Sequence, residues 1–522
     1  MRFPSPATAR SPRPRSRNCF RRRPQRKRPD PTRRRGFQAF RAGSNPKAPQ
    51  RRRPLSCIGR NNRMTNTRSV ALCGGAIAAA LLAAGSVQAQ TAFSTPSNAP
   101  SEAVTQQAAA TQPGLWDRPA LTGDWGGARR RLEDNGVTFT LNEVVDAVHN
   151  FNGGVREESR AAGQLFLGAT IDTEKAWGLP GGKVQATVFN RQGNSLANDA
   201  GLDLLQPVQT IYGRGTIWRL GQLWYEQSFN DGATALKLGR VTHGEDFGAT
   251  PCGNVMNLIL CGPASSQIVG GYLYNMPVSS WGARLRQRIT PELHVNLGVI
   301  ESNPENLRED RGFYLGTQGA TGTIYAGELQ WTPKFGANGD LPGTYKIGAW
   351  YDSSESNNIV YDVNGDYQAL TGLAFAREGH HSGVHANVQQ QLIAPQADGA
   401  HGLSVVGNLA IADRATNKLR SKAAVIVTYT GLIPGRAKDD VTFGVGAAIV
   451  NGRVTDAQRA QNDAGLRVGD PQDTEYAVEL NYGYRLTPAI TVRPGVQYIH
   501  NPGGQSDRDG IVVGGLKLVL TL

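Results

Sequence analysis

Three arginines stand at every second position in the segment WGARLRQRI, as Arg284, Arg286 and Arg288. If this segment is a β-strand, successive side chains point to opposite faces, so the three guanidinium groups share one face. Guanidinium groups donate hydrogen bonds to hydroxyl, carboxylate and phosphate oxygens. The pattern therefore predicts either a surface that selects oxygen-rich solutes or a salt-bridge network that only shapes a wall.

The segment RLGQLWYEQSF places an aromatic ring beside polar groups. If Leu223 and Tyr225 face lipid, then Gln222, Trp224 and Glu226 share the opposite face. A sugar needs this combination, because its C–H surface stacks on a ring and its hydroxyls bond to carboxylates and amides. Alternatively, Trp224 belongs to an aromatic girdle at a lipid boundary. We slightly favour the girdle for this residue.

The segment EYAVELNYGYRL, residues 475–486, has one apolar, aromatic face and one polar face. In a soluble β-protein the apolar face lies inside, whereas in a bilayer-spanning barrel it faces lipid and the polar face lines the lumen. The same alternation places His385, Asn387, Gln389 and Gln391 in the lumen. The candidate pore-lining residues are Arg284, Arg286, Arg288, Glu328, Lys346, Trp350, Asp352, Glu479, Arg485, Arg493, Lys517, Trp224 and Glu226. Without the Trp224 segment, these include seven basic and three acidic residues.

Strand follows strand through the main body of the chain, and no apolar run after Ala89 approaches the ~20 residues of a spanning helix. Connections alternate between short turns and long loops, which is typical of an outer-membrane barrel with periplasmic termini. We predict an all-β, transmembrane antiparallel β-barrel of about 16 strands over residues 137–522. A secreted β-sandwich or β-helix does not explain the alternating loops. The predicted strands are 137–149, 163–174, 182–191, 215–229, 233–243, 281–290, 293–302, 322–332, 343–353, 382–394, 402–413, 418–430, 440–450, 475–486, 489–500 and 511–522.

A short helix is expected before the barrel, at residues 121–136, on the periplasmic side. Thr122 or Asp124 can cap its start, and Gly136 suits its end. No other segment has a convincing helical pattern. Residues 90–120 are rich in Ala, Ser, Thr and Pro and are expected to form a flexible linker.

The positive charge of the chain is confined to its N-terminal part. Residues 1–89 hold 22 of the 56 Lys and Arg and one of the 42 acidic residues, so residues 90–522 carry a net charge of −7. Residues 64–89 have the pattern of a secretory signal peptide. We interpret the Arg/Pro-rich extension, 1–63, as disordered or as the product of a misassigned start, with Met64 the true start. The alternatives are a basic nucleic-acid-binding arm and a long export leader.

Two cysteines, Cys252 and Cys261, lie in the exported body of the chain. Their short separation and the oxidising compartment predict one disulfide, in an extracellular loop. Two free thiols are the alternative. Closing so short a loop contributes on the order of 2–3 kcal/mol.

The segments LTGDWGGARRRLEDNGV, RLGQLWYEQSF, LKLGRVTHGEDFG and WGARLRQRITPELHVNLGVIESNP resemble the carbohydrate-selective porin family of the OprB type. The resemblance runs from about residue 115 to residue 522. It implies a sixteen-stranded porin that admits glucose and similar monosaccharides by passive, mildly selective diffusion across the outer membrane of a Gram-negative bacterium. It also implies that loops and lumen Arg and Glu residues form the constriction.

Other functions fit less well. A general or anion-preferring porin is the nearest alternative, because of the basic excess in the lumen. No enzyme is predicted, since G-x-S-x-G, H-E-x-x-H and Gly-rich phosphate-loop motifs are absent. His380, His381 and His385 are not expected to bind metal, and no cofactor is expected. The expected partners are sugars, outer-membrane lipid, lipopolysaccharide and the barrel assembly machinery, with no nucleic acid and with a homotrimer or a monomer both open.

Overall fold

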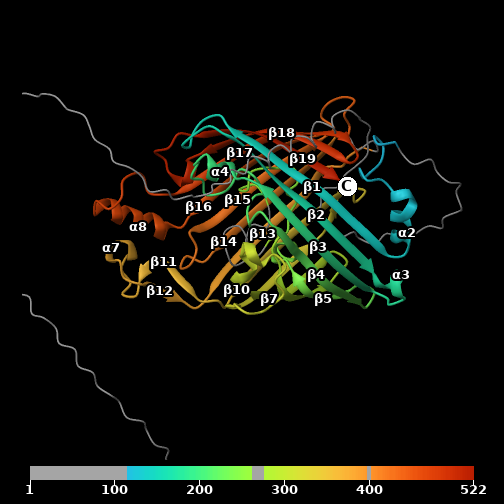
Figure 1. The fold of residues 1–522 in the computed structure, drawn as a ribbon, viewed down its shortest axis with the longest axis horizontal. Coiled ribbons are helices and arrows are strands. Elements are labelled where there is room, and N and C mark those ends of the chain that lie inside the picture. Colours follow the sequence, from blue (N-terminus) through green and yellow to red (C-terminus); the bar gives the residue numbers. More distant parts are fainter. Residues whose placement is uncertain (1–113, 262–274, 397–400) are drawn as a thin grey trace, which may run out of the picture. The chain divides into compact units, whose positions relative to one another are not determined.

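A closed antiparallel barrel dominates the structure (Figure 1). The computed structural model describes residues 114–261, 275–396 and 401–522. Each barrel strand pairs with the next along the chain, and the last pairs with the first. This confirms the predicted antiparallel barrel of sixteen strands. The strands are β1 (Val137–Asn150), β2 (Ser159–Asp172), β3 (Gly182–Gly193), β4 (Trp218–Phe229), β5 (Thr234–Val241), β6 (Ser280–Arg288), β7 (Leu293–Ser302), β8 (Gly322–Trp331), β10 (Leu341–Asp352), β13 (His381–Ile393), β14 (Gly402–Ala412), β15 (Leu419–Thr430), β16 (Asp440–Val450), β17 (Thr474–Thr487), β18 (Ile490–His500) and β19 (Ile511–Thr521).

Strand β17 shows which face points outward. Tyr476 and Leu480 are 43% and 48% exposed, whereas Glu475 and Glu479 are 1% and 0% exposed. The apolar face therefore lies on the outside of the barrel and the polar face lies inside. This is the arrangement of a barrel that spans lipid.

The barrel closes between β1 and β19, in a register that pairs Asn142 with Thr521. A segment before β1 crosses this seam at the end where β1 begins. The backbone N–H of Leu121 donates to the carbonyl of Thr521 at 2.9 Å. Arg129 donates to the carbonyls of Leu522 and Phe139, at 3.2 and 3.4 Å. The seam is thus held by side-chain contacts as well as by the strand ladder.

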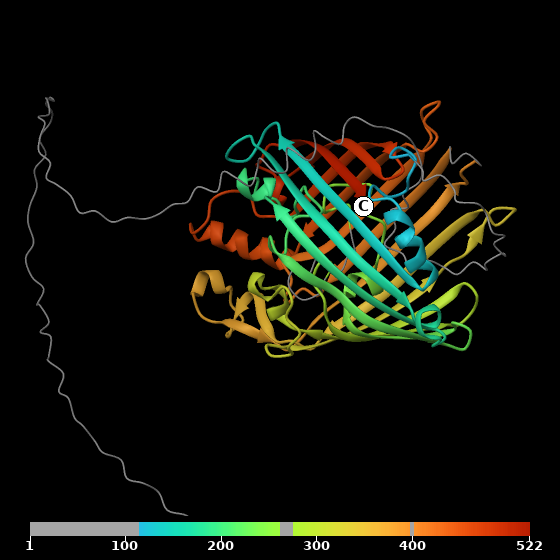
Figure 2. The ribbon, with the colours of Figure 1, turned by 45° about the vertical axis from the view of Figure 1, so that its right-hand side comes forward.

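The two ends of the barrel differ (Figures 1 and 2). Short connections at 230–233, 289–292 and 488–489 lie at the end that carries α2 (Ala128–Asp134) and α3 (Thr173–Trp177). The opposite end carries the long connections. Its additional elements are α4 (Leu196–Asp199), α5 (His243–Asp246), η2 (Pro304–Leu307), η3 (Glu309–Arg311), β11 (Ser356–Asp362), α7 (Gln368–Thr371), β12 (Phe375–Glu378), α8 (Gly452–Asp463) and η4 (Pro502–Gly504).

The helix before the barrel is shorter than predicted. It consists of η1 (Trp125–Gly127) followed by α2, and Gly127 occupies the position before α2 with φ +86. Asp124 accepts a hydrogen bond from the backbone N–H of Arg130 at 3.1 Å. Gly136 follows the helix with φ +83, a conformation that glycine adopts without strain.

Helix α8 contradicts the expectation that no other segment is helical. Asn451 caps its start by accepting from the backbone N–H of Arg453, and Gly465 follows its end with φ +69. Val454 and Ala457 pack on the cluster that covers the loop end of the barrel. Tertiary packing therefore stabilises a helix whose own pattern is weak. Strands β11, β12 and the two-residue β9 (Lys334–Phe335) were also not predicted. Among the described residues, no helix is long and apolar enough to cross a membrane.

Candidate functional site

Two long connections fold into the barrel and contact its inner face. The first, residues 194–217, joins β3 to β4, and the second follows β5 from residue 242. They touch each other where the N–H of Leu258 donates to the carbonyl of Pro207 at 2.9 Å. Together they narrow the lumen from within.

The first connection is held by carboxylate and amide groups of the distant strands. Glu475 of β17 accepts from the N–H groups of Leu205 and Gln206, at 2.8 and 3.2 Å. Gln497 of β18 donates to the carbonyl of Val208 at 3.0 Å. The connection is therefore fixed against the inner face of β17 and β18.

The second connection is held in the same way. Glu479 accepts from the N–H groups of Met256 and Asn257, at 2.9 and 2.8 Å. Lys422 of β15 donates to the carbonyls of Leu258 and Cys261, at 2.7 and 2.8 Å. Glu479 is fully buried, so it anchors the connection and presents no surface to a solute.

Cys252 and Cys261 are joined by a disulfide, with their Cα atoms 4.9 Å apart. The loop that they close lies against the inner wall, which differs from the predicted extracellular placement. Two glycines explain how it fits. A Cβ at Gly444 would lie 2.7 Å from Leu260, and one at Gly446 would lie 2.6 Å from Ile259. The loop buries its apolar side chains there instead of exposing them to water.

The three arginines of β6 have three different environments. Arg284 is buried and pairs with Glu226 at 2.7 Å and with Asp246 at 3.3 Å. Arg286 is half-buried and has no ion pair within the described part of the chain. Arg288 is exposed at the strand end and donates to the carbonyl of Asp231 at 3.3 Å. Only Arg284 belongs to a wall-to-loop network.

Trp224 lies inside the barrel, so our preference for the aromatic girdle was wrong. Its neighbours Leu223 and Tyr225 are 38% and 40% exposed, whereas Trp224 is 7% exposed. The ammonium group of Lys237 lies 4.5 Å from the centre of its ring, and Lys237 also pairs with Asp246 at 2.7 Å. Strand alternation with Leu223 and Tyr225 facing outward predicts that Trp224 faces inward, and the Lys237 ammonium group beside the Trp224 ring stabilises this placement.

Comparison with known proteins agrees with this architecture. Residues 156–522 match the model of the carbohydrate-selective porin, OprB family. The chain belongs to this family. Porin B of Pseudomonas aeruginosa is 38% identical over 411 residues, which cover 76% of this chain and 90% of that protein. The putative porin QuiX of Acinetobacter baylyi is 35% identical over 422 residues, which cover 77% and 93%. A high-pH structure of Pseudomonas putida OprB aligns with a TM-score of 0.74 and 37% identity, covering 80% of this chain and all of that one.

The protein is thus an outer-membrane sugar porin of a Gram-negative bacterium, as the resemblance implied. Its lumen-facing charges are mostly engaged with other protein groups. Arg493 binds Asp440 through two nitrogen–oxygen contacts of 2.6 and 2.8 Å. Lys517 pairs with Asp146 at 3.1 Å. The acidic partners offset the basic excess that the sequence suggested.

Helix α5 of the porin carries three titratable groups, of which His243 is buried and Glu245 and Asp246 are partly buried. Burial lowers the pKa of His243 to about 4. Burial raises the pKa of Glu245 to about 8, and this carboxyl contacts Gln222. Burial would also raise the pKa of Asp246, but Lys237 and Arg284 hold it below its usual value. The pKa values of the two neighbouring carboxyls of α5 are therefore shifted in opposite directions.

Glu328 and Lys346 hold the chain just after α5. Glu328 accepts from the N–H of Gly248 at 2.5 Å and contacts His385 at 3.0 Å. The ammonium group of Lys346 donates to the carbonyl of Ala249 at 2.9 Å. Both residues face the lumen and bind the loop, and Glu328 also accepts from the wall residue Asn296 at 3.3 Å.

Two other candidates are covered by protein. Trp350 is 3% exposed and packs in a cluster with Phe247 and Ile324. Asp352 is 0% exposed and accepts from Ser302 and from the backbone N–H of Ser354, each at 2.9 Å. Neither residue presents a surface to a passing solute.

The histidines of the β13 region point to different places. His385 contacts Glu328 inside the barrel, His381 contacts Thr416 at 2.7 Å, and His380 stacks on Tyr351 on the outside. Across the described residues, no group of three or more His, Cys, Asp or Glu is placed to hold a metal ion. Arg485 is partly buried and donates to the carbonyl of Lys438 at 3.2 Å.

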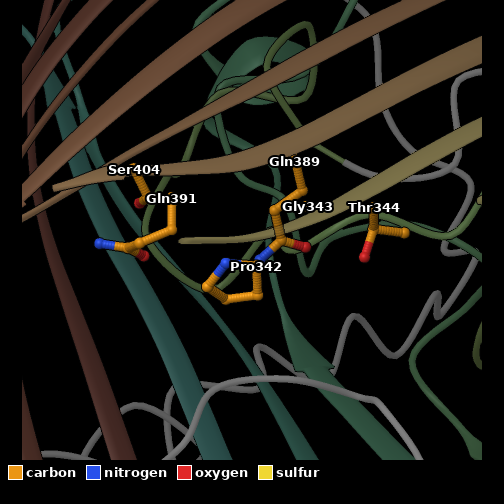
Figure 3. A pocket seen from close by; sticks show the side chains of 6 residues that line it. All are labelled: Pro342, Gly343, Thr344, Gln389, Gln391 and Ser404. Carbon is orange, nitrogen blue, oxygen red and sulfur yellow. The ribbon is translucent and has the colours of Figure 1, made fainter. Parts of the chain in front are cut away.

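A polar recess of about 90 Å³ lies where β10 and β14 begin and β13 ends (Figure 3). Its lining includes Thr344, Gln389, Gln391 and Ser404. All four side chains are at least partly exposed. None of them carries a charge. In contrast to the loop-filled middle of the lumen, this part of the wall offers neutral hydrogen-bonding groups.

Several residues of the site were not predicted from the sequence. Asp146 and Asp440 share the inward face of β1 and β16, so strand alternation could have identified them. Asp246 lies on a connection, and no sequence pattern indicates that it meets Lys237 and Arg284. The anchoring role of Glu479 also depends on the loop position.

Proposed function

We propose that this porin passes monosaccharides such as glucose by passive diffusion with mild selectivity. One observation carries the proposal. The lumen charges are mostly bound to each other or to the two inward connections, as in the Arg284–Glu226 and Arg493–Asp440 pairs. Neutral amides and hydroxyls, together with the few charged groups that stay partly exposed, are left to meet the solute. Such groups both donate and accept hydrogen bonds, as sugar hydroxyls require.

The residues proposed to meet sugar in the narrow region are those that stay partly accessible. They are Glu226, Arg286 and Lys346, with Trp224 behind them as an aromatic wall. Binding must be weak enough for release, so an affinity in the millimolar range or weaker is expected, and no energy input or chemical step is needed.

A general or anion-preferring channel is the second candidate. Arg286, Arg288 and Arg485 have no ion pair with a carboxylate among the residues that the structure describes, and this favours anions. The paired charges of the wall argue against a strong preference. A chloride-to-potassium permeability ratio far above one would favour this second candidate.

Liposome swelling with the purified porin tests the proposal. The solutes are glucose, xylose, sucrose and an amino acid of the size of glucose. Faster entry of glucose and xylose than of the amino acid is the expected result, because the lumen then recognises hydroxyls. Rates that follow size alone would mean a general pore. Single-channel ion selectivity on the same sample separates the anion channel from both.

A further inference from the structure

The polar recess between β10, β13 and β14 is lined by uncharged side chains. Thr344 lies directly opposite Gln389 in the β10–β13 ladder, and Gln391 lies opposite Ser404 in the β13–β14 ladder. Side chains that face each other across strands have Cβ atoms about 4.5–5.5 Å apart. The four groups therefore lie within the span of one or two sugar rings.

Most hydrogen-bonding groups of the recess have no partner in the described protein. Among the described residues, the side chains of Thr344, Gln389 and Ser404 have no hydrogen-bond partner in the protein. The side chain of Gln391 donates one N–H to the backbone carbonyl of Ile393 at 2.5 Å. The side-chain oxygen of Gln391 takes no part in that bond. This differs from the charged part of the lumen, where most groups already hold a loop.

Further hydroxyls continue the same row around the wall. Ser404 lies opposite Thr428 in the β14–β15 ladder, and Thr428 lies opposite Thr442 in the next. The hydroxyl oxygens of Thr428 and Thr442 are 3.1 Å apart. Lys346, the nearest charged residue along β10, has its ammonium group bound to the carbonyl of Ala249. The row therefore consists of uncharged side chains from β10 to β16, where Thr442 donates to the carboxylate of Asp440 at 3.1 Å.

The recess lies on the periplasmic side of the narrow region. It lies at the end of the barrel with the short connections, whereas α5 and the disulfide loop enter from the opposite end. In an outer-membrane barrel, the short connections are periplasmic. A solute that has passed the two connections meets the recess last.

We infer that Thr344, Gln389, Gln391 and Ser404 form an exit-side binding site for the hydroxyls of neutral sugars. The inference rests on the proposed function and adds a second contact point to it. Each hydrogen bond exchanged with water changes an affinity by about fivefold, so a site with a few such bonds stays weak. Weak successive sites allow a solute to enter and leave quickly.

The test uses glucose block of ion current through the full porin in planar bilayers, with glucose added to the periplasmic side. The variant is Thr344→Val, Gln389→Met and Ser404→Ala together. These three side chains have no hydrogen bond to the described protein, so the barrel loses no internal hydrogen bond. The half-blocking glucose concentration is expected to rise at least fivefold, with an unchanged chloride-to-potassium permeability ratio because no charge changes.

Gln330→Met is the matched control. Gln330 lies on the neighbouring strand β8, outside the recess, and its side chain also has no hydrogen bond within the described part of the chain. Its half-blocking concentration is expected to rise less than that of the triple variant, because Gln330 lies opposite Lys346 and outside the recess. An unchanged block in the triple variant, or an equal change in the Gln330 variant, overturns the exit site. If glucose fails to block the wild-type channel from either side, the proposed function fails as well.

Discussion

Replacing Glu479 by glutamine is expected to loosen the disulfide loop and widen the channel. The carboxylate accepts from the N–H groups of Met256 and Asn257 and from the amide of Asn481, at 2.8–2.9 Å. Glutamine keeps one acceptor oxygen and places an amino group where the other stood. At least one buried donor then lacks a partner, which costs about 1–3 kcal/mol.

The loss of charge on the remaining acceptor adds to this cost, because hydrogen bonds to charged groups are stronger by about 1 kcal/mol. A total of about 3 kcal/mol shifts the balance between a seated and a released loop by about 150-fold. The loop keeps its disulfide and the two bonds from Lys422. We therefore expect frequent opening of the loop and not its permanent release.

Single-channel recording and liposome swelling measure this effect. The expected results are a larger and noisier conductance and faster entry of sucrose relative to glucose. Glu355→Gln is the control, since Glu355 is exposed in a loop and pairs with the exposed Arg377 at 3.3 Å. If the Glu479 variant has the conductance and sucrose rate of the control, Glu479 does not hold the constriction.

Three further predictions concern pH, the disulfide and the arginines. The pKa of Glu245 is raised to about 8 from 4.5, so its contribution to stability is present below pH 4.5 and is lost as the pH rises through 8. Glu245→Gln is thus expected to raise the unfolding temperature, measured as the temperature at which the folded barrel shifts to the unfolded position on a gel, at pH 9 and not at pH 5. Replacing both cysteines by serine should lower the unfolding free energy by about 2–3 kcal/mol, measured by the same gel shift, and an unchanged temperature would contradict this. Arg286→Ala should lower the chloride-to-potassium permeability ratio more than Arg288→Ala, because Arg288 lies at the strand end; equal ratios would contradict this.

The barrel could be predicted because strand alternation is a local property. In β17 and β19 the apolar and polar residues separate by parity, and the predicted strands overlap all sixteen observed ones. The strand starts were less certain. Strand β2 begins at Ser159, four residues before the predicted start, because its pairing with β1 continues past the apolar core of the segment.

The interior could not be predicted to the same extent. Parity places Glu479, Lys517 and Arg493 on the inner face, but it does not show what covers them. Their coverage comes from connections that start more than 200 residues earlier in the chain, such as Asn257 against Glu479. Strand alternation does not predict such long-range contacts. The aromatic segment at Trp224 was assigned wrongly for the same reason, because its partner Lys237 gave no signal in the segment itself.

The anchoring of early loops by late strands has a consequence for assembly. Glu475 and Glu479 receive N–H groups from residues 205–206 and 256–257. A slip of β17 by one residue would turn both carboxylates toward lipid and leave those N–H groups unpaired. The position of both loops therefore depends on the register of β17, and a barrel closed one residue out of register would leave the loops without these carboxylate acceptors.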